Sequence, residues 1–135
     1  DCDIFISAAA VSDFKPKEIY KNKIKKKGNE KHLNLKMDKN SDILKVISEK
    51  NLNLKTVGFA AETENLLSNA KKKLSQKKLD LIVANDVSNK DIGFDSDENE
   101  VTLITKKEQK KIKKASKKIV SKKIVEFIAS KVVND

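Results

Sequence analysis

The chain has 135 residues, with 30 basic against 20 acidic side chains, a formal net charge of +10, one Cys and one His. This length fits one domain or part of a larger one, and the apolar residues fall in blocks, which indicates a folded domain rather than a disordered chain. The lone Cys2 and the lone His32 exclude an internal disulfide and a Cys/His zinc site. No apolar run approaches the roughly 20 residues that span a bilayer and no secretory signal is present, so we expect a cytoplasmic protein without a membrane partner.

The N-terminal third begins with a predicted strand. Residues 3–10 read Asp-Ile-Phe-Ile-Ser-Ala-Ala-Ala, a short apolar run suited to a buried strand. A buried parallel strand needs neighbours on both sides, so we expect this chain to be a fragment of a larger domain. Residues 11–16 leave the strand, and the Lys-rich residues 18–30 are predicted to form a mobile loop. The alternation of Leu33, Leu35 and Met37 predicts an edge strand over residues 32–37.

Helices and strands alternate through the rest of the chain. Capping side chains at residues 40–42 predict a helix that starts at Ile43, and Thr63 is predicted to cap a second helix that ends near Lys78. Strands are predicted over residues 55–61, 79–84 and 101–105, with residues 85–99 as the longest loop. Residues 107–133 carry apolar side chains in one stripe, which predicts a long amphipathic helix. This alternation is typical of an α/β fold with a parallel sheet.

The excess positive charge lies mainly in the C-terminal segment. Every basic residue is Lys, and residues 106–135 hold 11 of them against three acidic residues. This segment is either a solvated helix face or a basic module whose helix binds nucleic acid or another anionic surface. We favour the solvated face, and do not expect nucleic acid as a partner, because Arg is absent and aromatic residues make up only 4% of the chain. A third alternative is a scaffold piece that only completes a dimer.

The predicted sheet also indicates where a ligand binds. In an open α/β sheet, ligands lie beyond the carboxyl ends of the strands. Residues 8–15, 59–63 and 85–94 leave these ends, and they are rich in small and polar side chains that let a ligand approach the backbone closely. The sequence contains no Walker A loop, no Gly-x-Gly-x-x-Gly and no zinc motif, and the acidic run at residues 95–100 lacks the Gly and Glu of a calcium loop.

Four side chains near this edge carry the chemistry of a candidate site. Asp13 leaves the first strand where a ligand would lie, and its carboxylate suits a metal ion or a base edge. Lys23 lies on the predicted loop. Lys73 and Lys77 are four residues apart on one predicted helix, so both ammonium groups are expected to point the same way and to suit a polyphosphate. Each lysine taken alone is an ordinary surface residue in a chain with 30 of them.

Six motifs occur in an order and at a spacing that resemble a known family. They are Ala9-Ala10-Val11-Ser12-Asp13-Phe14-Lys15-Pro16, Lys23-Ile24-Lys25-Lys26, Asn40-Ser41-Asp42-Ile43-Leu44, Val57-Gly58-Phe59-Ala60-Ala61-Glu62-Thr63, Ala84-Asn85-Asp86-Val87-Ser88 and Gly93-Phe94-Asp95-Ser96-Asp97-Glu98-Asn99. Over nearly its whole length the chain resembles phosphopantothenate–cysteine ligase (phosphopantothenoylcysteine synthetase), a family of coenzyme A biosynthesis. In many prokaryotes this ligase is the C-terminal half of a bifunctional protein whose other half is a flavin-dependent phosphopantothenoylcysteine decarboxylase.

The resemblance implies a Rossmann-like parallel sheet flanked by helices in three layers, in a protein that is usually a homodimer. It also implies a two-step ligase reaction. CTP, in most prokaryotic members, activates the carboxylate of 4′-phosphopantothenate as an acyl nucleotidylate with loss of pyrophosphate, and the amine of cysteine then forms the amide. Mg²⁺ supports the first step by neutralising the triphosphate. FMN is expected only if the full-length protein carries the decarboxylase domain.

The resemblance further implies roles for individual residues. Lys23 falls on the family's loop lysine, which contacts the nucleotide and assists the acyl-nucleotidylate chemistry, and Asp13 falls on its nucleotide-binding acid. The other implied nucleotide-binding residues are Ala9, Ala10, Ser41, Asp42, Ile43, Leu44, Phe59, Lys73 and Lys77. Asn85 and Asp86 fall on the acyl-substrate or dimer side. At the position of Ser41 the family often has Pro.

One part of the family pattern is absent from this sequence. The missing part is the N-terminal segment, with its Gly-rich strand–loop–helix and the Arg/Asn-bearing stretch that handles the acyl intermediate. Because one oxyanion-stabilising donor is worth about 2.7–4 kcal/mol, we expect this portion to bind nucleotide yet to catalyse poorly or not at all by itself.

Overall fold

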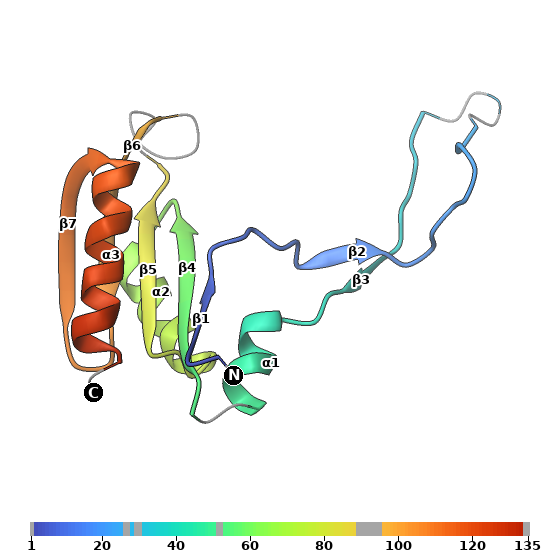
Figure 1. The fold of residues 1–135 in the computed structure, drawn as a ribbon. Coiled ribbons are helices and arrows are strands. Elements are labelled where there is room, and N and C mark those ends of the chain that lie inside the picture. The colour runs from blue at the N-terminus through green and yellow to red at the C-terminus, as the bar shows by residue number, and fades with distance from the viewer. Residues whose placement is uncertain (1, 26–27, 29–30, 51–52, 89–95, 134–135) are drawn as a thin grey trace. The chain divides into compact units, whose positions relative to one another are not determined.

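A computed structural model of the chain describes residues 2–25, 28, 31–50, 53–88 and 96–133 (Figure 1). The chain divides into two compact units. The first, here called the core unit, comprises Asp1–Ala8 and Ile43–Asp135, and the second, the hairpin unit, comprises Ala9–Asp42. None of the helices in the described ranges is long and apolar enough to cross a membrane.

The core unit is a mixed five-stranded sheet with helices on both faces, in strand order β1-β4-β5-β6-β7 (Figure 1). Its elements are β1 (Ile4–Ser7), α1 (Ile43–Lys50), β4 (Lys55–Glu62), α2 (Leu66–Gln76), β5 (Leu81–Asp86), β6 (Glu98–Ile104), β7 (Gln109–Ser116) and α3 (Lys117–Lys131). Strands β1, β4 and β5 run parallel, as predicted, whereas β6 and β7 are antiparallel additions. A tight turn, in which the Thr105 amide donates to the Glu108 carbonyl at 2.9 Å, joins these last two strands as a hairpin.

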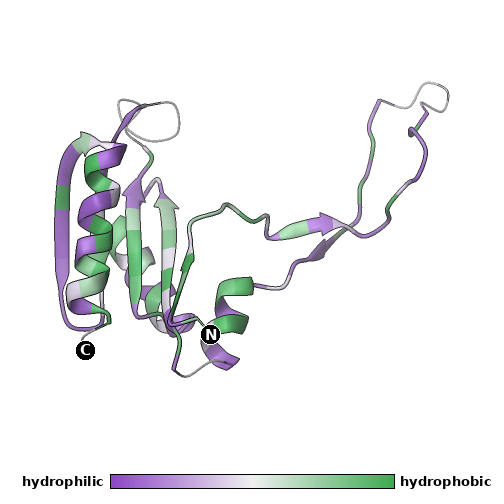
Figure 2. Cartoon of the chain, viewed as in Figure 1, coloured by the Kyte–Doolittle hydropathy of each residue, from purple (hydrophilic) through white to green (hydrophobic). Residues whose placement is uncertain are grey.

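Two apolar cores lie on the two faces of this sheet. Successive side chains of a strand point to opposite faces, so Val57 of β4 packs with α3 whereas Ala60 packs with α1 and α2. Strand β5 is buried on both faces over Leu81–Ala84, and its unbroken apolar run is what the sequence pattern of a central parallel strand predicts. Figure 2 shows the contrast with β7, which is mostly hydrophilic.

Gly58 allows helix α1 to pack closely on β4. A methyl group built on Gly58 would lie 2.7 Å from Cδ2 of Leu44 and 3.0 Å from Cδ1 of Leu79, closer than ordinary carbon contacts. The absent side chain therefore makes room for Leu44, which is buried in the core beneath α1.

The predicted helix over residues 107–133 is wrong in its first half, because β7 occupies Gln109–Ser116 and α3 begins at Lys117. A β-bulge explains the misleading pattern. Asn99 pairs with Ala115 and Val101 pairs with Ile112, so a step of two residues on β6 matches a step of three on β7. The extra residue brings Ile112 and Ala115 to the same core at a spacing that is typical of a helix.

Smaller differences concern where elements begin. Thr63 does not cap α2; the N-cap is Asn65, which has a left-handed backbone (φ 51°) and makes no side-chain cap hydrogen bond. The edge strand predicted over residues 32–37 is displaced, because the strand there is β3 (Met37–Lys39). The predicted loop 85–99 is shorter than expected, because its first residues belong to β5 and its last residues to β6. Residues 89–95 lie outside the described residues, and so do the first three residues of the predicted motif Gly93–Asn99.

The hairpin unit contains β2 (Phe14–Pro16) and β3, which pair antiparallel. Asn40 fastens the base of this hairpin: its side-chain amide donates to the Ser12 carbonyl and its backbone amide to the Asp13 carbonyl, both at 2.8 Å. Backbone hydrogen bonds rather than a buried core hold the unit, since nearly every described residue in it is exposed. The predicted mobile loop falls between the two strands, and residues 26–27 and 29–30 of it lie outside the described residues.

Candidate functional site

The carboxyl ends of β4 and β5 meet at one edge of the core-unit sheet. Because these strands are parallel neighbours, Ala61 lies beside Asn85 and Glu62 beside Asp86. The Val87 amide continues the ladder by donating to the Glu62 carbonyl at 3.0 Å. This edge is where the sequence predicts a ligand, and a charged pair and an exposed aromatic ring stand close to it.

Glu62 and Lys73 form the charged pair. Lys73 Nζ lies 2.5 Å from Glu62 Oε1, and Asn69 Nδ2 donates to Oε2 of the same carboxylate at 3.2 Å. The Glu62 side chain is only 13% exposed whereas that of Lys73 is 44% exposed, so the carboxylate anchors an ammonium group that still reaches solvent. An ammonium group has three donors, and one bond to Glu62 leaves two for a ligand.

Sequence reasoning missed Glu62 as a site residue. The signal was present, because Glu62 closes the Ala-Ala-Glu-Thr motif at the end of a predicted buried strand. Its pairing with Lys73 depends on how α2 lies against β4, which no spacing rule supplies for residues so far apart in sequence.

Lys77 lies one helical turn beyond Lys73, at the C-cap of α2. Its amide donates to the Lys73 carbonyl at 3.0 Å, and its own carbonyl accepts a hydrogen bond from Ser48 Oγ of α1 at 2.5 Å. The backbone of Lys77 thus joins α2 to α1, further along the helix from the carboxyl edge than Lys73.

Phe59 stands on the other face of the sheet from α2. Its strand neighbour Val83 belongs to the core beneath α3, and Phe59 itself is 43% exposed, so part of its ring faces solvent. Ala61, two residues on, is also exposed. Phe59 and Lys73 can therefore touch one ligand only if that ligand passes over the carboxyl edge.

Asn85 and Asp86 are the last two residues of β5, and their side chains differ in hydrogen bonding. Asn85 Oδ1 is buried and accepts no hydrogen bond within the described part of the chain. Asp86 Oδ1 accepts from the backbone amide of Ser88 at 3.0 Å and from its hydroxyl at 2.6 Å, and these hydrogen bonds lower the pKa of the Asp86 carboxyl. The edge therefore combines an unsatisfied amide oxygen with a fixed carboxylate.

The two α1 residues differ in exposure. Leu44 is buried among the α1–α2 core residues, which assigns it a packing role. Ile43 is half-exposed at the first position of the helix, where a ligand can reach it.

The remaining predicted residues belong to the hairpin unit. Ala9, Ala10, Asp13, Lys23 and Ser41 are exposed and Asp42 is half-buried. Asp13 and Ser41 lie at the same hairpin base, because the Asn40 amide donates to the Asp13 carbonyl. Lys23 makes no hydrogen bond or ion pair to any other described residue.

Within the described ranges, no three His, Cys, Asp or Glu side chains come together as a metal cage. Mg²⁺ commonly binds through one or two carboxylates together with substrate phosphates, and the single carboxylate of Asp13 fits that kind of donor set. The assignment of such an ion to Asp13 stays a prediction.

The basic C-terminal segment is not one continuous helix. Within the described residues, its lysines pair with acids in four places: Lys111 with Glu100 at 2.6 Å, Lys114 with Glu98 at 3.3 Å, Lys122 with Glu126 at 4.0 Å, and Lys131 with Glu108 at 3.7 Å. These pairs offset part of the positive charge on β7 and α3. Whether the segment is a solvated face or a basic module stays a prediction.

The sequence profile of the family described as "DNA/pantothenate metabolism flavoprotein C-terminal domain" matches residues 1–132. The chain belongs to this family. The curated relatives include several that are named "Coenzyme A biosynthesis bifunctional protein CoaBC". The one from Vibrio vulnificus (strain CMCP6) is 43% identical over 129 residues, which cover 95% of this chain and 32% of that protein. The one from Bacillus subtilis (strain 168) is 45% identical over 129 residues, which cover 95% and 31%.

The chain thus spans about a third of the length of the curated relatives it matches. Among solved structures, it is similar to the "C-terminal Domain of Coenzyme A biosynthesis bifunctional protein CoaBC" with a TM-score of 0.74 and 30% identity, over 98% of this chain and 56% of that one. It also shares its fold with the "DNA/Pantothenate Metabolism Flavoprotein from Streptococcus pneumoniae", with a TM-score of 0.67, 20% identity, and coverage of 95% and 60%. The predicted α/β fold class is confirmed.

Proposed function

We propose that this chain supplies the nucleotide-binding part of a phosphopantothenate–cysteine ligase of coenzyme A biosynthesis. Family membership and the names of the relatives support the pathway. The observation that carries the proposal is the Lys73 ammonium, anchored by Glu62 at the carboxyl edge of β4 and still open to solvent. Such a group suits the phosphates of a nucleotide at the edge where α/β sheets bind their ligands.

In the proposed reaction, a carboxylate oxygen of 4′-phosphopantothenate attacks the α-phosphorus of CTP. The bond to the bridging oxygen breaks and pyrophosphate leaves, which gives the acyl cytidylate. The cysteine nitrogen then attacks the acyl carbon, CMP leaves, and the nitrogen loses a proton as the amide forms. Mg²⁺, held by Asp13 and the phosphates, would supply charge neutralisation for the first step. FMN belongs to the decarboxylase half of bifunctional relatives, and no residue of this chain is assigned to it.

Lys73 stabilises the triphosphate in this proposal. One ammonium about 4 Å from a phosphate oxygen contributes about 1 kcal/mol in bulk water and about 4 kcal/mol near a protein surface. Glu62 fixes the position of Lys73 before the ligand arrives, so less side-chain freedom is lost on binding. Lys77 adds a second positive charge on the same helix.

Phe59, Ala61 and Asn85 offer a surface for the non-phosphate part of a ligand. The exposed ring of Phe59 suits stacking against a base, and Ala61 lets the ligand approach the strand. The unpaired Asn85 oxygen suits a ligand N–H or O–H, because an unmade buried hydrogen bond costs about 1–3 kcal/mol until a donor arrives. We assign Asn85 and Asp86 to the acyl-substrate or dimer side.

The hairpin unit carries the remaining assigned roles. We assign to Lys23 the stabilisation of charge on the transferring nucleotidyl group, and to Asp13 nucleotide binding. Ala9, Ala10, Ser41, Asp42 and the core-unit residue Ile43 are assigned to the nucleotide as well, and all but Asp42 are exposed.

The hairpin unit also supports a homodimer. Its exposed large apolar side chains are Val11, Phe14, Ile19, Tyr20, Ile24, Leu33, Leu35 and Met37. A run of this kind exceeds the scattered apolar residues of ordinary monomer surfaces. We assign a second copy of the chain as the cover of this apolar surface.

Nucleotide-induced stabilisation tests the proposal. CTP with Mg²⁺ at a hundredfold excess over its dissociation constant should stabilise the chain by about 2.7 kcal/mol, measured by urea unfolding with and without ligand. Lys73→Gln, Lys23→Gln and Asp13→Asn should each reduce that gain. ATP in a parallel series compares the two nucleotides.

Lys71→Gln is the matched control, because Lys71 is an exposed lysine on the same helix with no described partner. It should leave the gain unchanged. Absence of stabilisation by every nucleotide, or equal losses in Lys71→Gln and Lys73→Gln, would contradict the proposal. In a full-length relative, Lys73→Gln should also slow pyrophosphate release from CTP and 4′-phosphopantothenate.

A further inference from the structure

Asn69 of α2 contacts the Glu62–Lys73 pair, and the proposed nucleotide site assigns it no role. Asn69 and Lys73 are four residues apart on this helix, so their side chains lie on the same face of it. Both reach the Glu62 carboxylate, but at different oxygens: Lys73 Nζ lies 2.5 Å from Oε1, and Asn69 Nδ2 donates to Oε2 at 3.2 Å. The carboxylate is thus shared between an ammonium group and an amide.

The orientation of the Glu62 carboxylate depends on Asn69. Among the described residues, this carboxylate accepts hydrogen bonds from Asn69 and Lys73 alone, and the Glu62 side chain is 13% exposed. The described part of the chain brings no backbone amide to it. If the bond from Asn69 is lost, only the lysine restrains the carboxylate, and the two flexible side chains regain rotamer freedom together.

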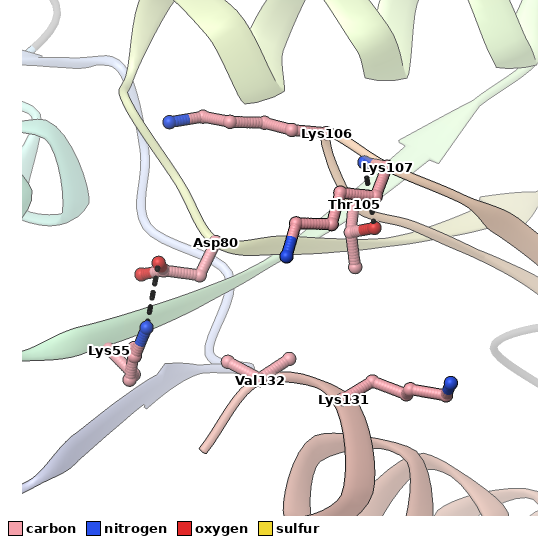
Figure 3. A pocket seen from close by; sticks show the side chains of 7 residues that line it. All are labelled: Lys55, Asp80, Thr105, Lys106, Lys107, Lys131 and Val132. Atoms are coloured by element: carbon pink, nitrogen blue, oxygen red, sulfur yellow. Dashed lines mark hydrogen bonds and ion pairs between the residues drawn. The ribbon is translucent and has the colours of Figure 1, made fainter. Parts of the chain in front are cut away.

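An ion pair at the amino edge of the same sheet is held differently (Figure 3). Asp80 Oδ1 lies 3.9 Å from Lys55 Nζ, at a pocket of about 220 Å³ that both residues line. The other oxygen, Asp80 Oδ2, accepts from the Thr56 amide at 2.8 Å and from the Thr56 hydroxyl at 3.2 Å. A strand backbone therefore fixes the Asp80 carboxylate. At the carboxyl edge, the corresponding second oxygen of Glu62 is held by the side chain of Asn69.

Asn69 also ties the turn between β4 and α2 to the helix. Its Nδ2 group donates a second hydrogen bond to the Glu64 carbonyl at 3.0 Å, and its backbone amide donates to the Asn65 carbonyl at 2.9 Å. Both partners of the side-chain amide are acceptors, so only its NH₂ end can face them. Asn65 makes no side-chain cap hydrogen bond, so this turn gains its side-chain hydrogen bond to α2 from Asn69.

We propose that Asn69 is a positioning residue for Lys73. It fixes the Glu62 carboxylate, and the fixed carboxylate holds the ammonium group at the carboxyl edge before an anion arrives. A lysine side chain has many rotamers, and ordering it in advance reduces the freedom that binding must remove. The service of Lys73 to nucleotide phosphates rests on the proposed function, whereas the positioning of Lys73 is independent of it.

The first measurement needs no ligand. It compares the mobility of the Lys73 side chain, by NMR relaxation of its ε-methylene group, in the unaltered 135-residue chain and in Asn69→Ala. The Lys73 signal is identified as the one that disappears in Lys73→Gln. In Asn69→Ala its order parameter should fall toward that of Lys71, an exposed lysine of α2 with no described partner. An unchanged order parameter would overturn the proposal.

The second measurement is calorimetric titration with CTP and Mg²⁺. Asn69→Ala should raise the dissociation constant about two- to tenfold, the range expected when one more side chain is ordered on binding. In a Lys73→Gln background the same substitution should leave the dissociation constant unchanged, because Asn69 acts through Lys73. Equal effects in both backgrounds would overturn the proposal, since Asn69 would then act on the ligand or on the fold directly.

Gln76→Ala is the matched control, because Gln76 is an exposed amide side chain of α2 with no described partner. It should change neither the Lys73 order parameter nor the dissociation constant. Both alanine variants should unfold at a similar urea concentration, because alanine is the best helix former. If Lys73 becomes mobile in Asn69→Ala while no nucleotide binds even the unaltered chain, the positioning role is supported and the proposed function is contradicted.

Discussion

The core unit and the hairpin unit use their apolar side chains in opposite ways. Val57, Leu81 and Val83 of the core unit are 0% exposed, whereas Leu33 and Leu35 of the hairpin unit are 63% and 52% exposed. The sheet is thus stabilised by its own buried surface, and the hairpin by a few backbone hydrogen bonds. A region that buries nothing contributes little to stability, which leaves its side chains available to a ligand or a second copy.

The proposed site residues divide along the same boundary. Phe59, Lys73 and Lys77 stand on secondary structure that is packed on a core, whereas Asp13 and Lys23 stand on exposed backbone. Binding affinity and geometry are better maintained by side chains on rigid elements. Loss of a core-unit contact should therefore act on a binding geometry that is already in place.

The largest contrast should come from the same substitution in both units. Leu81→Ala leaves a cavity in the core beneath α3 and should lower the free energy of unfolding by about 2–5 kcal/mol. Leu35→Ala removes an exposed side chain and should change it by less than about 0.5 kcal/mol. Urea unfolding followed by circular dichroism measures both, at a protein concentration where the chain is monomeric.

Comparable losses in the two variants would show that the hairpin leucine is buried in solution. Repeating the measurement at rising protein concentration sharpens the contrast. If a second copy covers the hairpin, the effect of Leu35→Ala should grow with concentration while that of Leu81→Ala stays the same.

A smaller effect is expected at the contact between α1 and β4. Gly58→Ala places a methyl group against Leu44 and Leu79 and should cost about 1–3 kcal/mol, because both neighbours are buried side chains that must shift. In a Leu44→Ala background the methyl group finds space, so Gly58→Ala should cost less there. A double-mutant cycle by urea unfolding gives the coupling, and additive costs would contradict the close approach.

The parts of the fold that the sequence predicted are those with a strong local pattern. The continuous apolar run of β5, the buried strand β4 and the helical spacing of α2 were all predicted within a few residues. The helix predicted over residues 107–133 failed in its first half, because a bulge gives β7 the spacing of a helix. Such a bulge depends on how β7 pairs with β6, so the local sequence of β7 does not predict it.

The sequence predicted where the candidate site lies in the fold, but not which of its side chains contact one another. Parallel topology alone placed the ends of β4 and β5 at one edge, as the structure bears out. The Glu62–Lys73 pair joins residues of two elements, and the buried oxygen of Asn85 reflects the packing around it. The sequence could have predicted that Phe59 lies on the sheet face away from α2. Neighbouring residues of a strand point to opposite faces, so Phe59 and Ala60 of β4 must lie on different faces.

The smallest predicted effect is a pH dependence at the carboxyl edge. Hydrogen bonds from Ser88 lower the pKa of Asp86, so the folded state favours the ionised carboxylate. Their contribution to stability is therefore fully present above the pKa of an unfolded aspartate, and it is lost as pH falls through the lower pKa of the folded state. Ser88→Ala removes the hydroxyl donor and should raise the Asp86 pKa toward its ordinary value, measured by NMR titration of the side-chain carboxyl carbon.

The hairpin unit supplies the comparison for that measurement. Glu18 accepts a hydrogen bond from the Tyr20 hydroxyl at 2.8 Å, and this bond together with its negative charge raises the Tyr20 pKa. Glu18→Gln should lower it, and because the pair is fully solvated the change should shrink with added salt. The Asp86 shift comes first from hydrogen bonds to Ser88 and should persist in salt. If the Asp86 shift faded with salt as the Tyr20 shift does, the Asp86–Ser88 contact would be no better ordered than the hairpin, and the carboxyl edge would not be the preformed surface that nucleotide binding requires.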